Sequence, residues 1–107
     1  MALGELGYQV ASRWPAGVSF ALGDCYLVLE QSSALSATTH ERTRPGLNHL
    51  AFHAGSRAEL DQLVAAAPAY GWRLLFADQH PYAGGPDHYA GYLADPGGYE
   101  VELVAEA

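Results

Sequence analysis

The chain contains a short internal repeat, and this repeat limits the folds that the sequence can adopt. Residues 6–10 match residues 70–74, and residues 26–29 match residues 99–102. Self-similarity of this kind indicates that one supersecondary unit occurs twice. A chain of 107 residues has room for one hydrophobic core. We therefore expect two related modules within a single domain.

One amphipathic helix is predicted over residues 57–70. Its apolar side chains recur at the spacing of one buried helical face; they are Leu60, Leu63, Val64 and Ala67. Ser56 and Glu59 have the spacing of a capping box, and Gly71 can adopt the left-handed conformation that ends a helix. We expect the last turn to fray, because Pro68 lacks a backbone N–H.

Short segments rich in β-branched or aromatic residues predict strands around this helix. These segments are residues 8–13, 18–22, 26–31, 47–54, 72–77, 89–94 and 99–104. The second half has the order strand, helix, strand, strand, strand, whereas the first half has only the last three strands. We expect an α+β fold with a truncated first module at residues 1–31, a linker at 32–46 and a complete module at 47–107.

Composition excludes several classes of protein. The net charge is −7 and the chain has no Lys, which argues against a nucleic-acid partner. No apolar run reaches the length that a membrane span needs, and the first residues do not have the pattern of a secretory signal. A single cysteine, Cys25, allows no intrachain disulfide. We expect a cytoplasmic protein without membrane contact.

Two predicted strands place metal-binding side chains on one face of the sheet. Side chains alternate along a strand, so His49 and His53 share the face turned away from the helix. The same rule puts Glu100 and Glu102 on that face. Imidazole together with carboxylate suits zinc, iron, nickel or manganese. We therefore expect imidazoles and carboxylates to lie together on an open sheet face.

The second half resembles the vicinal oxygen chelate superfamily of glyoxalases, extradiol dioxygenases and bleomycin-resistance proteins. The resemblance lies in Gly-Leu-Asn-His-Leu-Ala-Phe at residues 46–52 and in the Asp-Pro-Gly-Gly hairpin that leads to Val-Glu-Leu at residues 101–103. It implies βαβββ modules that form a cupped mixed sheet, with a divalent metal held by His49 and Glu102. The first module departs from the pattern, because Leu29 rather than Glu30 matches Glu102.

A loop rich in Gly and Pro at residues 79–89 could cover the mouth of such a cup. His88 in this loop is a candidate for proton transfer, together with Glu100. Candidate substrate contacts are Tyr82, His88, Tyr92 and His53. Each of these tyrosines and histidines could instead be an ordinary packing or surface residue.

The resemblance implies two functions that the sequence leaves open. The first is a divalent-metal-dependent lyase, isomerase or dioxygenase acting on a small oxygenated molecule. The second is a drug-binding protein of the bleomycin-resistance type, which an acidic and tyrosine-rich chain would suit. An inactive truncated paralogue is a further alternative, so catalysis is itself uncertain. The expected unpaired sheet edge predicts a homodimer.

Overall fold

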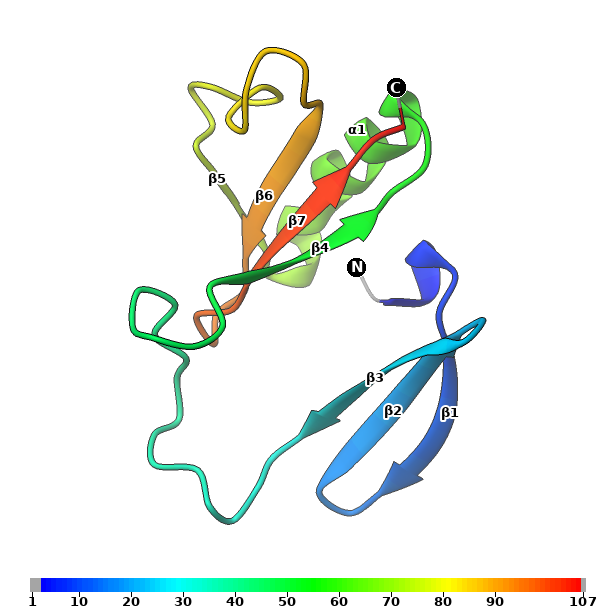
Figure 1. Ribbon diagram of the computed structural model, residues 1–107, viewed down its shortest axis with the longest axis vertical. Coiled ribbons are helices and arrows are strands. Elements are labelled where there is room, and N and C mark those ends of the chain that lie inside the picture. The colour runs from blue at the N-terminus through cyan, green and yellow to red at the C-terminus, as the bar shows by residue number, and fades with distance from the viewer. Residues whose placement is uncertain (1–2, 107) are drawn as a thin grey trace. The chain divides into compact units, whose positions relative to one another are not determined.

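The computed structural model describes residues 3–106, and the chain divides into two compact units (Figure 1). The first unit covers the described residues 3–38, and the second covers residues 39–106. The boundary falls inside the segment that the sequence predicts to be a linker. Residues 39–46 thus belong to the second unit.

The first unit is a three-stranded antiparallel meander that follows one 3-10 turn. The elements are η1 (Leu3–Leu6), β1 (Gln9–Trp14), β2 (Gly17–Leu22) and β3 (Cys25–Glu30). The strand order is β1-β2-β3, and the only irregularity in register lies between Val10 and Ser12 on β1. These three strands agree with the prediction of a module without its first strand and helix.

The second unit has the complete βαβββ order that the sequence predicts. Its elements are β4 (His49–His53), α1 (Arg57–Ala66), η2 (Ala67–Tyr70), β5 (Arg73–Leu75), β6 (Ala90–Ala94) and β7 (Glu100–Val104). The sheet order is β4-β7-β6-β5, in which β4 and β7 run parallel and the other pairs run antiparallel. The sheet is therefore mixed, and the α+β fold class is confirmed.

The ends of α1 follow the local sequence signals. The Ser56 side chain accepts a hydrogen bond from the Glu59 amide, and the Glu59 carboxylate accepts one from the Ser56 amide, which confirms the capping box. The α-helix ends at Ala66, and the chain tightens into η2, which contains Pro68. Proline cannot donate the α-helical hydrogen bond at that position. No helix in residues 3–106 is long and apolar enough to cross a bilayer.

The internal repeat is visible in backbone hydrogen bonds. The amides of Gly7 and Tyr8 bond to Gly4 and Leu3 at 3.1 and 3.0 Å. At the equivalent place in the second unit, the amides of Gly71 and Trp72 bond to Pro68 and Ala67, both at 3.1 Å. Gly7 and Gly71 also have positive φ angles of 95° and 89°. Both meanders therefore begin with the same 3-10 turn and left-handed glycine.

The core of the second unit lies between α1 and the sheet. Its fully buried large side chains are Leu60, Leu93 and Leu103. The helix packs mainly against β6, which lies inside the sheet, whereas β4 is an edge strand. Leu50 on β4 therefore stays 40% exposed, although alternation directs it to the helix side. In the described part of the first unit, only Ser19 is buried.

Candidate functional site

The carboxylate of Glu102 on β7 lies between two imidazoles. Nε2 of His49 is 3.0 Å from one carboxylate oxygen, and Nε2 of His88 is 2.5 Å from the other. Glu102 itself is only 7% exposed. Each oxygen of this buried carboxylate thus has one imidazole as its partner, and this arrangement is the central feature of the candidate site.

Strand register brings these groups to one face of the sheet. In the parallel pair β4–β7, His49 lies opposite Glu100 and Ala51 lies opposite Glu102. In the antiparallel pair β6–β7, Tyr92 lies opposite Glu102. Directly opposed residues point to the same face. The prediction that His49, Glu100 and Glu102 share a face is therefore confirmed.

The aromatic ring of Tyr92 lies beside the Glu102 carboxylate. Its ring meets His49 edge-on at a centroid distance of 5.9 Å and Phe76 at 5.7 Å. Burial raises the pKa of the Tyr92 hydroxyl above its usual value of 10.0, and the charge of Glu102 and a hydrogen bond with it raise the pKa further. The hydroxyl thus keeps its proton at neutral pH and remains a hydrogen-bond donor.

His49 is oriented by the residue before it. The Oδ1 atom of Asn48 lies 2.7 Å from Nδ1 of His49, while Nδ2 of Asn48 donates to the carbonyl oxygen of Arg42 at 3.1 Å. The second contact fixes which end of the amide faces the imidazole. Both ring nitrogens of His49 therefore face acceptor oxygens.

Two opposing effects set the pKa of Glu102. Burial of the carboxyl group raises the pKa, but hydrogen bonds from His88 and His49 and the charges of the two rings outweigh burial. The pKa is therefore lower than its usual value of 4.5. Glu102 remains ionised at neutral pH, and the site keeps an acceptor for both imidazoles.

Acidification is expected to destabilise the protein partly through Glu102. The unfolded chain binds a proton at this carboxyl more readily than the folded chain, because the folded pKa is lowered. The stabilisation is complete above the ordinary pKa of 4.5 and is lost as pH falls through the folded pKa. Urea unfolding across this range should show a weaker pH dependence in Glu102→Gln than in the wild type. Equal pH dependence in the two proteins would contradict this role.

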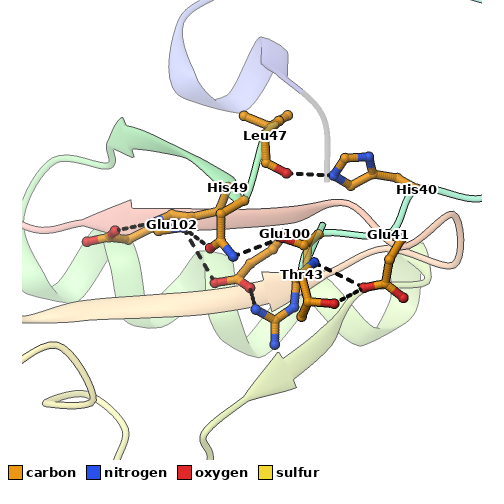
Figure 2. Close-up of polar contacts among 9 residues, drawn as sticks. His40, Glu41, Thr43, Leu47, His49, Glu100 and Glu102 are labelled. Atoms are coloured by element: carbon orange, nitrogen blue, oxygen red, sulfur yellow. Dashed lines mark hydrogen bonds and ion pairs between the residues drawn. The ribbon is translucent and has the colours of Figure 1, made fainter. Parts of the chain in front are cut away.

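Glu100 differs from expectation because its part of the face is covered. The side chain is 3% exposed, and Oε1 lies 3.0 Å from Nη1 of Arg42 in an ion pair (Figure 2). Arg42 comes from the segment before β4, which the sequence indicates only as a linker. This segment folds back over the sheet, so the expectation of an open face was wrong at Glu100. The sequence contains no motif that would have identified Arg42.

Two other candidate residues lie apart from Glu102. His53 is exposed at the end of β4, and within residues 3–106 it makes no hydrogen bond to Glu102. Tyr82 packs edge-on against Tyr89, whose hydroxyl donates to Asp61 on α1 at 2.7 Å. Tyr82 thus contacts a residue that reaches the helix. The loop from β5 to β6 brings His88, rather than Tyr82, to the carboxylate.

Gly84 leaves space for the ring that approaches Glu102. A Cβ atom at this position would lie 2.6 Å from the Tyr92 hydroxyl and 2.7 Å from Cδ2 of His88. We expect Gly84→Ala to lower the free energy of unfolding by about 1–3 kcal/mol, the usual cost of overpacking. Urea unfolding measures the change. Gly4→Ala is the control, because a Cβ there meets no atom within 4 Å; equal stability of both variants would contradict the prediction.

The donor atoms suit a divalent ion in their chemistry but not in their number. Imidazole nitrogen and carboxylate oxygen are common ligands of zinc, iron, nickel and manganese. Within residues 3–106, however, no three His, Cys, Asp or Glu side chains gather as a group that could hold an ion. A stable site normally needs about three protein ligands. His49 and Glu102 are therefore at most part of a metal site.

Known proteins are similar to this chain over most of its length. No family model matches the sequence. The uncharacterized protein YqjT of Bacillus subtilis (strain 168) is 44% identical over 104 residues, which cover 96% of this chain and 81% of YqjT. The crystal structure of a candidate glyoxalase from Bacillus halodurans is 45% identical, with a TM-score of 0.89, and the match covers 97% of this chain and 79% of that one.

A more distant structure has the same fold. A glyoxalase/bleomycin resistance protein from Albidiferax ferrireducens T118 has a TM-score of 0.73 at 22% identity, and the match covers 98% of this chain and 81% of that one. Together with the βαβββ unit and the facing His49 and Glu102, these matches define the class of protein. The chain belongs to the glyoxalase/bleomycin resistance/dioxygenase family, within the vicinal oxygen chelate superfamily.

Proposed function

We propose that this chain is a glyoxalase-type enzyme that acts on a small oxygenated molecule with the help of a divalent ion. The observation that carries the proposal is the buried Glu102 carboxylate with one imidazole on each oxygen. Perturbed carboxylates with specific partners are typical of functional sites. Membership of the glyoxalase family supports the same class of reaction. The expected cytoplasmic location remains a prediction.

The residues of this face have distinct proposed roles. His49 and Glu102 would contribute two ligands to the ion, which when bound would polarise a substrate oxygen as a Lewis acid. His88 would hold or move a proton at Nε2, because its ring approaches the site from a loop and is not covered. Tyr92 would donate a hydrogen bond to the substrate. Glu100 suits proton transfer less well, since it is buried against Arg42.

Metal content tests the proposed enzyme. The wild-type protein should bind one Zn²⁺ or Ni²⁺ ion per site after incubation and dialysis, and His49→Ala should lose the ion because it lacks one of two ligands. Elemental analysis of the dialysed proteins measures this loss. His53→Ala is a matched control, because it removes an exposed imidazole from the same strand. Retention of the full metal content in His49→Ala would overturn the assignment.

We also propose a homodimer that completes this incomplete donor set. In the second unit β7 pairs with β4, whereas β3, which holds the equivalent place in the first unit, is an edge strand. Apolar side chains on the first unit are exposed, with Leu29 at 53% and Val28 at 48%. Unpaired edges and exposed apolar groups favour association with another copy. Ligands from two copies could then meet at one ion.

The homodimer predicts a molar mass of twice that of the chain. Light scattering coupled to size-exclusion chromatography should give about 23 kDa, twice the 11.4 kDa of the monomer. The reason is that none of the apolar residues in the described part of the first unit is fully buried. Leu29→Asp should shift the population toward monomer, whereas the control Leu35→Asp, at an exposed leucine outside the strands, should not. A monodisperse wild-type monomer would contradict the homodimer.

A binding protein of the bleomycin-resistance type is the second candidate function. It is favoured by one observation, that no group of three His, Cys, Asp or Glu side chains within residues 3–106 is arranged to hold an ion. Aromatic side chains beside a carboxylate could bind a cationic guest without chemistry. Titration with a cationic aromatic drug distinguishes the two functions. Binding that survives treatment with a chelator favours sequestration over metal-dependent catalysis.

A further inference from the structure

Glu100 is the most buried acidic residue in the described part of the chain, with 4% exposure. Its Oε1 atom is fully covered and accepts no hydrogen bond, so the nearby Arg42 guanidinium compensates it by charge alone, at 3.0 Å. A buried carboxylate without a partner is strongly unfavourable. Arg42 is therefore the group that pairs with this carboxylate inside the protein.

His49 lies within reach of both buried carboxylates. Nε2 donates to Glu102 at 3.0 Å, while Nδ1 is 3.9 Å from Oε2 of Glu100 (Figure 2). A small movement of the ring would bring Nδ1 into contact with Glu100. Each ring nitrogen of His49 thus faces a different carboxylate, and a shift of the ring toward Glu100 would move Nε2 away from Glu102.

We propose that Arg42 is a positioning residue that keeps His49 on Glu102 by neutralising Glu100. Without the guanidinium, Glu100 would draw the His49 ring toward itself and away from Glu102. Arg42 acts by a second route as well, because its carbonyl oxygen accepts from the Asn48 amide that orients His49. The role assigned to Arg42 rests on the proposed function of Glu102.

The segment that carries Arg42 is held firmly on the sheet. The His40 amide donates to the carbonyl oxygen of Gly97 at 2.7 Å, and Nε2 of His40 lies 2.8 Å from the carbonyl oxygen of Leu47. The His40 ring stacks on Tyr99 with a centroid distance of 4.5 Å and an angle of 3°. Arg42 thus belongs to a segment, residues 39–46, that is anchored to the sheet and that we call the strap.

The test follows the hydrogen bond of His49 in metal-free protein. ¹⁵N-edited NMR detects the Nε2–H proton of His49, whose signal is identified by its absence in His49→Ala. We expect Arg42→Met to lose this protected signal or to shift it strongly. Arg44→Met is the matched control, because it removes a neighbouring guanidinium that makes no ion pair with Glu100. Arg42→Lys keeps the charge and should retain the signal.

A double variant separates charge compensation from a purely structural role. In Arg42→Met with Glu100→Gln, the competing charge is gone, so the His49 signal should return. If Arg42→Met does not fold, a folded double variant with the His49 signal still supports the proposal. An unchanged signal in Arg42→Met, or a double variant that is unfolded or lacks the signal, overturns it.

These outcomes are independent of the proposed enzyme activity. The NMR measurement uses no metal and no substrate. A protein that binds no metal would therefore still give an interpretable result. Retention of metal in His49→Ala would refute the proposed function but not the effect of Arg42 on the ring. Conversely, an unchanged His49 signal in Arg42→Met would refute only the role of Arg42.

Discussion

Glu102→Gln is expected to weaken divalent-ion binding by more than about 100-fold, since even the loss of an outer hydrogen-bond partner of a metal ligand costs roughly 10- to 100-fold. The glutamine has nearly the same size but no charge, so the two imidazoles lose the ionised acceptor that each oxygen provides. Isothermal titration calorimetry with Zn²⁺ or Ni²⁺ measures the affinity. Turnover, once a substrate is known, should fall in parallel by about 100-fold or more.

A charge-matched control makes this result specific. Glu106→Gln removes the same charge from an exposed position near the end of β7, so the net charge of the two variants is equal. We expect Glu106→Gln to bind the ion as the wild type does. Equal affinities for the two variants would show that Glu102 holds no ion, and would favour the binding-protein alternative.

Leu60→Ala is expected to lower the free energy of unfolding by about 2–5 kcal/mol, the usual range for a buried leucine. Leu60 on α1 is fully buried. Its side chain lies close to Gly91 on β6, so truncation leaves a cavity between helix and sheet. Urea unfolding followed by circular dichroism measures the loss.

Leu50→Ala is the control for the core prediction. It makes the same truncation on edge strand β4, where the side chain is 40% exposed. Its cost should be well below that of Leu60→Ala, because the solvent already reaches the side chain. Similar costs for the two variants would mean that the helix does not cover the sheet in the way that the structure shows.

The strands and the loops of the second unit contribute different residues to the candidate site. The βαβββ unit places Glu102 and His49 on central and edge strands, where backbone hydrogen bonds hold them. His88 and Arg42 come from a loop and a strap, which vary more easily than strands. Proteins that share the fold can therefore differ in the residues that correspond to His88 and Arg42. Fold alone does not decide between catalysis and binding.

Much of the fold could be predicted because its signals are local. The capping box at Ser56 depends on residues three apart, and the left-handed turns at Gly7 and Gly71 depend on the absence of a side chain. The strands follow from alternation and from turn residues such as those of the 95–98 hairpin. The shortened α-helix shows the same principle, since Pro68 ends the α-helical hydrogen bonding.

The candidate site was predictable only in its strand residues. Period-two alternation is enough to put His49 and Glu102 on one face, because the geometry of a strand determines it. The approach of His88 depends on the path of a long loop and on the space beside Gly84. The position of Arg42 depends on a strap that folds back on the sheet. Neither path has a periodic signal in the sequence.

The internal repeat, the βαβββ order and the shared face of His49 and Glu102 were determined by the sequence alone, because local hydrogen bonding and side-chain alternation produce them. Only the tertiary structure decided which groups meet the carboxylates. It brought His88 to Glu102 and Arg42 to Glu100 through contacts between residues far apart in the chain. Such contacts depend on packing and on the cost of a buried charge, which no short window of sequence contains.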